Sequence, residues 1–149
     1  MGDEPRQDRV AYLVRDDDAR KAAMRKPTVL AIGLDPRFAD YRAMPQFTPE
    51  LVRAYIEAEI NRLRDAGFEV DTCLLTADAT AEYDVEAALR SKRFGCVVIG
   101  AGLREPSEHL LLFEKVLNLV HRLAPDACIA FNSTPADTAE AVRRWIVSR

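Results

Sequence analysis

The strongest candidate for chemistry in this sequence is a glycine-containing turn that carries an arginine. The segment Gly100-Ala101-Gly102-Leu103-Arg104 directly follows the apolar run Cys96–Ile99. Its glycines allow the main chain to approach a ligand closely, and a helix starting at Ser107 would turn unpaired N–H groups toward it. Arg104 adds a forked guanidinium that suits phosphate or carboxylate. We therefore predict an anion-binding turn. The alternative is that the glycines only form the turn, while Arg104 pairs in solvent with Glu105 or Asp35.

A second candidate group follows the apolar run Thr28–Ile32. Gly33-Leu34-Asp35-Pro36 ends that run, and Arg37 comes next. A carboxylate at the end of a strand can bind a hydroxyl, a cation or an amine, and Arg37 can bind an anion. The alternative for Asp35 is an Asx-type turn, in which its side chain accepts a hydrogen bond from the nearby main chain.

A third polar group, Asn132-Ser133-Thr134, follows the apolar run Cys128–Phe131. Its short side chains can donate to an anion or a sugar, or can cap the helix that Pro135 opens. His109, near the start of an expected 107–123 helix, can serve as an acid or base if it faces the same site. A surface position is the alternative for His109, as it is for His121.

The elements that must position these residues follow from a repeated pattern of strand and helix. The apolar runs Thr28–Ile32, Val70–Leu75, Cys96–Ile99 and Cys128–Phe131 have the composition of buried strands, and amphipathic helical patterns follow each of them. This alternation predicts a three-layer α/β/α sandwich with a four-stranded parallel sheet.

Right-handed crossovers favour the strand order 2-1-3-4, as in flavodoxin-like or half-Rossmann domains. That order opens a crevice at the carboxyl ends of strands 1 and 3, where the polar groups described above converge.

Several common sites are excluded by their missing motifs. The first turn lacks the G-x-G-x-x-G of a dinucleotide site, and the sequence contains neither a P-loop nor a G-x-S-x-G nucleophile elbow. The loops after the strands also lack the residues that flavin binding or aspartate phosphorylation would need. Cys73, Cys96 and Cys128 lie within apolar runs, as buried, reduced thiols do. We identify no cofactor and no metal site.

Length and composition predict a single domain at 28–149, preceded by a charged extension. Residues 1–27 mix acidic and basic side chains, and we expect them to be partly disordered or to form a short helix. The net charge of −3 provides no basic face for nucleic acid. No apolar run reaches the ~18 residues of a membrane span. The first residues are too charged for a secretory signal, so we expect a cytoplasmic location.

One resemblance extends over about four-fifths of the chain, from Leu30-Ala31-Ile32-Gly33-Leu34-Asp35-Pro36 to Arg143-Arg144-Trp145. The most distinctive string of this resemblance is Val98-Ile99-Gly100-Ala101-Gly102-Leu103-Arg104-Glu105-Pro106. The sequence resembles a family of small bacterial flavodoxin-like or Rossmann-like α/β proteins. The resemblance implies the same fold. Because that family has no established activity, the resemblance implies no catalytic or binding residues.

Three functions remain open from the sequence. The first is a binding module that holds a small anionic metabolite or nucleotide through Asp35, Arg37, the 100–104 turn and the 132–134 segment. The second is a small enzyme in which Asp35 is the general base, Arg104 the electrostatic stabiliser and His109 the acid. The third is a homodimer without a small ligand, because the sheet leaves both edge strands open to pairing. We favour the first, and the third can hold alongside it.

Overall fold

The strands form one parallel sheet in the order predicted from the sequence. The computed structural model describes residues 26–146. In it, β1 (Thr28–Leu34) lies between β2 (Glu69–Leu75) and β3 (Cys96–Ile99), and β4 (Cys128–Phe131) pairs with the far side of β3. The strand order β2-β1-β3-β4 confirms the prediction.

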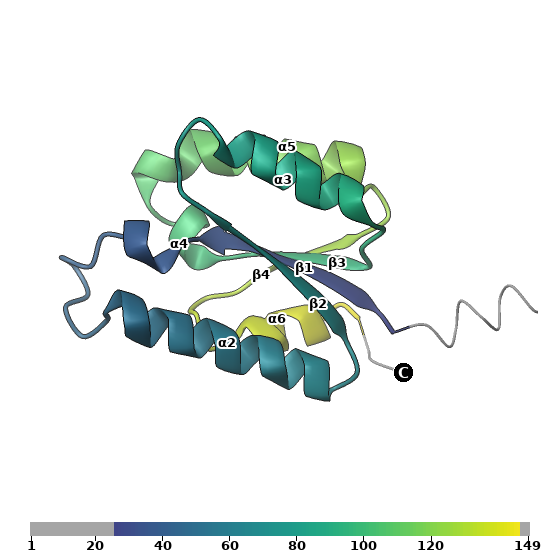
Figure 1. Ribbon diagram of the computed structural model, residues 1–149, viewed down its shortest axis with the longest axis horizontal. Coiled ribbons are helices and arrows are strands. Elements are labelled where there is room, and N and C mark those ends of the chain that lie inside the picture. Colours follow the sequence, from purple (N-terminus) through teal and green to yellow (C-terminus); the bar gives the residue numbers. More distant parts are fainter. Residues whose placement is uncertain (1–25, 147–149) are drawn as a thin grey trace, which may run out of the picture.

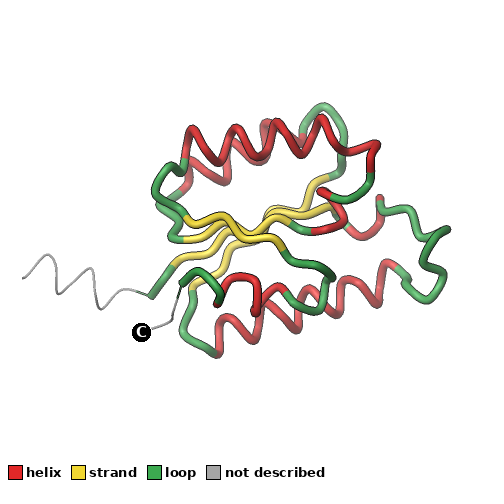
Figure 2. Tube along the Cα trace, turned by 180° about the vertical axis from the view of Figure 1, so that it is seen from behind, coloured by secondary structure: helices red, strands yellow, loops and turns green. Residues whose placement is uncertain are grey.

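Helices cover both faces of this sheet (Figure 1). On one face, α3 (Ala81–Ser91) packs against α5 (Leu110–Leu123), and on the other α2 (Pro49–Asp65) packs against α6 (Thr138–Arg143). Figure 2 shows the same three layers from behind. The predicted three-layer, flavodoxin-like α/β architecture is therefore confirmed. Within residues 26–146, no helix is long and apolar enough to cross a membrane.

The alternation of side chains along β1 divides the hydrophobic core between the two faces. Leu30 and Ile32 belong to the cluster under α3 and α5, whereas Val29 packs in the cluster under α2 and α6. Ala31, which has the same parity as Val29, also packs against this second cluster. The side of the sheet that faces α2 is thus built partly from small residues.

Local sequence signals mark both ends of α2. The Thr48 hydroxyl oxygen accepts a hydrogen bond from the Leu51 N–H at 3.1 Å, and Pro49 is the first helical residue. After the helix, Gly67 has a φ of 95°, a left-handed conformation that favours glycine.

The helix predicted from Ser107 to Leu123 begins differently. A single turn of helix, α4 (Ala101–Arg104), starts directly after β3, and a 3-10 turn, η2 (Ser107–His109), separates it from α5. The predicted start at Ser107 is wrong, because α5 begins at Leu110 and the Ser107 side chain makes no capping hydrogen bond. Pro106 has no N–H to continue the first turn, which explains the interruption.

The last helix is also shorter than predicted. It begins at Thr138, after a turn in which the Asp137 carboxylate accepts hydrogen bonds from the main-chain N–H groups of Ser133 and Thr134 at 2.9 and 3.0 Å. The expectation that Asn132, Ser133 or Thr134 caps this helix is therefore wrong. Most of the predicted N-terminal extension, residues 1–25 with the expected short helix, lies outside the described residues, as do residues 147–149.

Candidate functional site

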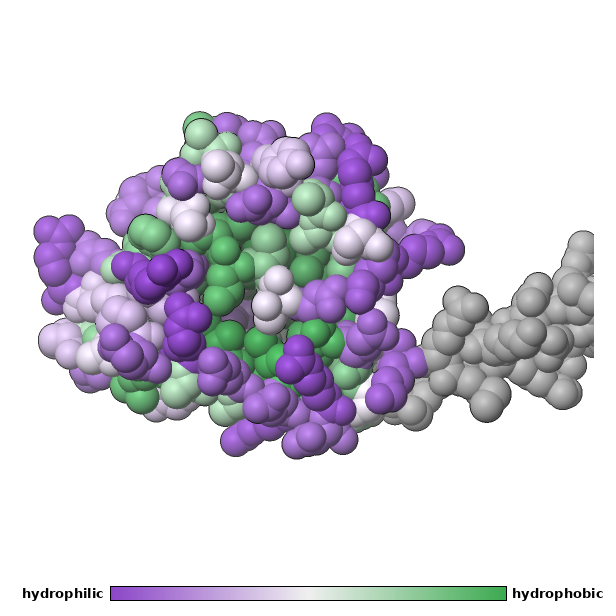
Figure 3. Space-filling model, viewed as in Figure 1, coloured by the Kyte–Doolittle hydropathy of each residue, from purple (hydrophilic) through white to green (hydrophobic). Residues whose placement is uncertain are grey.

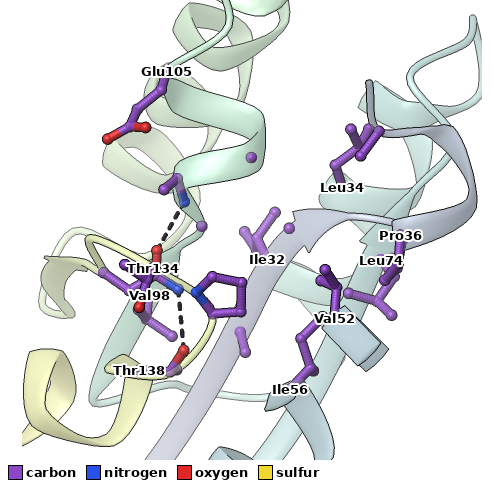
Figure 4. A pocket seen from close by; sticks show the side chains of 18 of the residues that line it. Ile32, Leu34, Pro36, Val52, Ile56, Leu74, Val98, Glu105, Thr134 and Thr138 are labelled. Carbon is purple, nitrogen blue, oxygen red and sulfur yellow. Dashed lines mark hydrogen bonds between the residues drawn. The ribbon is translucent and has the colours of Figure 1, made fainter. Parts of the chain in front are cut away.

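A cavity of about 240 Å³ lies at the carboxyl ends of β1 and β3, on the side of the sheet that faces α2. Figure 4 shows side chains from the sheet on one wall and Val52 and Ile56 of α2 on another. The loop between η1 (Pro36–Phe38) and α2 completes the enclosure with Tyr41 and other apolar side chains. The cavity therefore occupies the crevice that the strand order predicted.

Small residues on β1 create this space. Ala31 and Gly33 line the cavity floor, whereas their neighbour Leu30 packs in the cluster on the opposite face. Ile32 belongs to that opposite cluster and also contributes to the cavity lining. A Cβ atom added at Gly33 would lie 3.8 Å from Cδ2 of Leu74, an ordinary contact, so sterics alone do not require glycine there. The sequence analysis missed these residues. The sequence signal that could have found them is the occurrence of two small residues at alternate positions of a strand whose other residues are bulky.

The α2 side chains on the cavity wall were also missed. The helical spacing of Val52, Ile56 and Ile60 is that of an ordinary core-facing stripe, but all three line the cavity. Their pattern gives no signal that distinguishes a cavity wall from a packed core. Only the tertiary structure, which places these side chains around the cavity, reveals the difference.

The polar side chains that line the cavity lie mainly at the start of α6. Asn132 and Thr138 are 8% and 7% exposed, and Asn132 Nδ2 donates to the Thr138 hydroxyl oxygen at 3.0 Å. Asn132 Oδ1 accepts a hydrogen bond from the Ala101 N–H at 2.8 Å, which ties β4 to the start of α4. Ser133 and Thr134 also line the cavity, and both side chains are exposed to solvent.

The glycine-containing turn uses most of its amides inside the fold. The Gly100 N–H donates to the Ile32 carbonyl at 2.9 Å, and the Leu103 and Arg104 N–H groups both donate to the Gly100 carbonyl. The Ala101 N–H is held by Asn132, as described above. Gly100 and Gly102 do line the cavity. Fewer amides remain for an anion than the sequence suggested.

Within the described residues, the Arg104 side chain contacts other parts of the protein. Its guanidinium donates to the main-chain carbonyl of Asn132 and lies 5.0 Å over the ring of Phe131. It is not among the residues that line the cavity. The structure thus brings Asn132, Ser133, Thr134 and the two glycines together at the cavity, and places Arg104 behind this wall.

Asp35 forms the local turn that was weighed as an alternative. Its carboxylate accepts hydrogen bonds from the Arg37 main chain at 3.0 Å and from the Arg37 side chain, and Arg53 of α2 approaches at 3.2 Å. The hydrogen bonds from Arg37 hold the pKa of the Asp35 carboxyl below its ordinary value. Within residues 26–146, no hydrogen bond or ion pair joins Asp35 to Arg104.

The remaining candidates lie away from the cavity. His109, at the end of η2, is half-buried and does not line it. Burial raises the pKa of the Cys96 thiol to about 12 and that of Cys73 to about 11, so both stay protonated at neutral pH. Among the described residues, no cluster of histidine, cysteine and acidic side chains is placed to bind a metal ion.

The electrostatic character of the cavity follows from its lining. The walls formed by the described residues contain no arginine, lysine, histidine or cysteine. The one charged side chain there is Glu105, which is exposed at the edge of the cavity. The arrangement suits the binding of an apolar body beside a small polar patch.

The comparisons with known proteins add no functional information. A scan against models of protein families and a search of curated proteins found no match to this chain. No residue role can therefore be carried over from a relative, and the site must be interpreted from its own geometry.

Proposed function

We propose that this protein binds a small, mainly apolar molecule in the cavity between β1 and α2. The observation that supports this proposal is the composition of the walls, which are formed largely by residues such as Ala31, Gly33, Val98 and Ile56. Ligand sites in parallel α/β sheets also lie at the carboxyl ends of the strands, where this cavity is found. Its volume of about 240 Å³ is below the ~300–1,000 Å³ of typical drug-sized sites, so the ligand is small.

The affinity expected for such a ligand is modest. Each buried CH₂ group contributes about 0.8 kcal/mol, and the lost freedom of the ligand offsets a large part of the total. We expect dissociation constants of about 0.1–1 mM for an unadorned aromatic hydrocarbon such as ethylbenzene. A natural ligand with matched polar groups would bind more tightly.

The experiment is to fill the cavity and measure ethylbenzene binding by calorimetry. Ala31→Leu places a larger side chain on the floor, and Gly33→Val does the same one position further along β1. Ala58→Leu is the matched control, because Ala58 is exposed on α2. We expect wild type and Ala58→Leu to bind and both filled variants to lose binding. Equal binding by the folded Ala31→Leu and Gly33→Val variants and the wild type would contradict the proposal.

The functions that the sequence left open remain proposals beside this one. An anionic metabolite or nucleotide is supported by the position of the cavity, which is the predicted crevice. The enzyme with Asp35, Arg104 and His109 gains no support from their separate positions. A homodimer is supported by exposed apolar side chains such as Leu111 and Trp145, and a cytoplasmic location by three free cysteines.

A further inference from the structure

The buried amide of Asn132 has a hydrogen-bond donor that the described residues do not use. Its orientation is fixed, because the Ala101 N–H can only donate and must therefore face Oδ1, at 2.8 Å. Nδ2 then faces the Thr138 hydroxyl at 3.0 Å. A side-chain amide carries two donor hydrogens. Within residues 26–146, Nδ2 makes only this one hydrogen bond.

Thr138 has a second unused donor at the same place. A hydroxyl group can accept hydrogen bonds and donate one. The Thr138 oxygen accepts from Asn132, and no described residue accepts the Thr138 proton. Both side chains line the cavity, and Figure 4 shows the dashed hydrogen bond that ends at Thr138.

Unused donors at this depth have an energetic consequence. Asn132 and Thr138 are more than nine-tenths buried, and a buried donor without a partner costs about 1–3 kcal/mol. Buried polar groups in folded proteins are therefore almost always paired. An oxygen atom of a molecule inside the cavity would be placed to accept from both groups.

The charges around the cavity indicate that this acceptor is neutral. No cationic side chain lines the walls formed by the described residues, and Arg104 is engaged with the Asn132 carbonyl and Phe131. The nearest charged group on the lining is the Glu105 carboxylate, which repels an anion. A carboxylate or phosphate in the cavity would lose its hydration without gaining a counter-ion.

We propose, on the basis of the function proposed above, that the ligand is a neutral carbonyl compound with an apolar body. Its carbonyl oxygen accepts hydrogen bonds from the Thr138 hydroxyl and from Nδ2 of Asn132. Its apolar body lies between Ala31 and Val98 of the sheet and Ile56 of α2.

Three probes of similar shape separate this inference from the proposed function. Acetophenone carries a neutral carbonyl, ethylbenzene is the hydrocarbon, and benzoate is the anion. We expect acetophenone to bind about 2- to 10-fold more tightly than ethylbenzene, the effect of one net hydrogen bond, and benzoate to bind most weakly. The measurement is a titration of the ¹⁵N-labelled protein followed by NMR. Both aromatic probes shift nearby signals through their ring currents, but the Asn132 side-chain NH₂ signals should show an additional downfield shift with acetophenone, as expected for a new hydrogen bond.

A pair of Thr138 variants tests the role of the hydroxyl group. Thr138→Val removes it at nearly constant volume, and Thr138→Ser retains it. We expect Thr138→Val to lose the preference for acetophenone over ethylbenzene while ethylbenzene still binds, and Thr138→Ser to keep the preference. If the valine variant does not fold, the Asn132 signals of the wild type still decide the matter.

The outcomes distinguish failure of the inference from failure of the proposed function on which it rests. Binding of none of the three probes would overturn the proposed function itself. Equal binding of acetophenone and ethylbenzene, as expected if a water molecule occupies the polar patch, would overturn the inference and leave the function intact. Tighter binding of benzoate than of acetophenone would overturn the neutral acceptor and favour an anionic ligand.

Discussion

Asp35 shows how a residue that resembles a catalytic group can serve the fold. Its side chain is only 10% exposed and is held by Arg37 and Arg53, which connect the end of β1 to α2. Protonation would remove the charge that both arginines contact. Because the pKa is lowered in the folded state, this carboxylate stabilises the protein above its ordinary pKa near 3.8, and the stabilisation is lost as the pH falls toward the lower folded value.

We predict that Asp35→Asn lowers the free energy of unfolding by about 1–3 kcal/mol at pH 7 and flattens its decrease in acid. The asparagine still accepts the Arg37 main-chain hydrogen bond but carries no charge. Denaturant unfolding between pH 7 and pH 2 measures both effects. Asp40→Asn is the control. The Asp40 carboxylate likewise binds the main chain and side chain of an arginine two residues later, Arg42, but both of these side chains are exposed. Equal effects of the two substitutions would contradict a structural role specific to Asp35.

Arg104 illustrates which residue roles the sequence could predict and which it could not. Its place beside the crevice follows from the strand order, and pairing in solvent with Glu105 or Asp35 is the alternative that the sequence offers. The partner was not predictable, since the Asn132 carbonyl and the Phe131 ring come from β4 and the loop after it, nearly thirty residues along the chain. The sequence shows that an arginine has hydrogen-bond donors, but which acceptor they contact depends on tertiary packing.

At the scale of elements, α6 depends on a residue from another helix. Glu59 of α2 is buried, and its Oε1 accepts a hydrogen bond from the Ala139 N–H in the first turn of α6 at 3.4 Å. Its other oxygen lies 3.4 Å from Nε of Arg62. The carboxylate therefore provides a cap that no side chain of α6 supplies itself.

We predict that Glu59→Ala lowers the free energy of unfolding by about 1–3 kcal/mol and speeds amide hydrogen exchange in α6, most strongly at Ala139. Glu59→Gln should retain part of the protection, because its side-chain oxygen can still accept the hydrogen bond. Glu57→Ala, an exposed position on the same helix, is the control. Unchanged exchange at Ala139 in Glu59→Ala would show that the carboxylate does not cap this helix.

The elements that could be predicted from the sequence are those whose formation depends on residues within them or directly beside them. The strands follow from apolar runs, and α2 from Thr48, Pro49 and Gly67. The starts of α5 and α6 could not be predicted in the same way. Pro106 divides the segment after β3 into separate turns, and the cap of α6 comes from Glu59, 80 residues earlier. Long-range capping leaves no local pattern in the sequence.

At the scale of the whole molecule, the two faces of the sheet are packed differently. The cluster under α3 and α5 is continuous, whereas the α2 face combines a packed region around Leu63 and Phe68 with the cavity. Figure 3 shows apolar side chains between the two helical layers on the side of β2, and half-buried Leu74 of this strand lines the cavity. The crevice was predictable from the strand order, but its apolar walls depend on how α2 and the loop before it pack against the sheet.

Whether the cavity holds an apolar ligand can be measured by methyl NMR of the labelled protein. On addition of ethylbenzene, we expect shifts of the Ala31, Val98 and Ile56 methyl signals and none for the exposed Leu110 and Leu111. Shifts confined to Leu110 and Leu111, or no shifts at saturating ethylbenzene, would contradict the proposed binding of an apolar ligand.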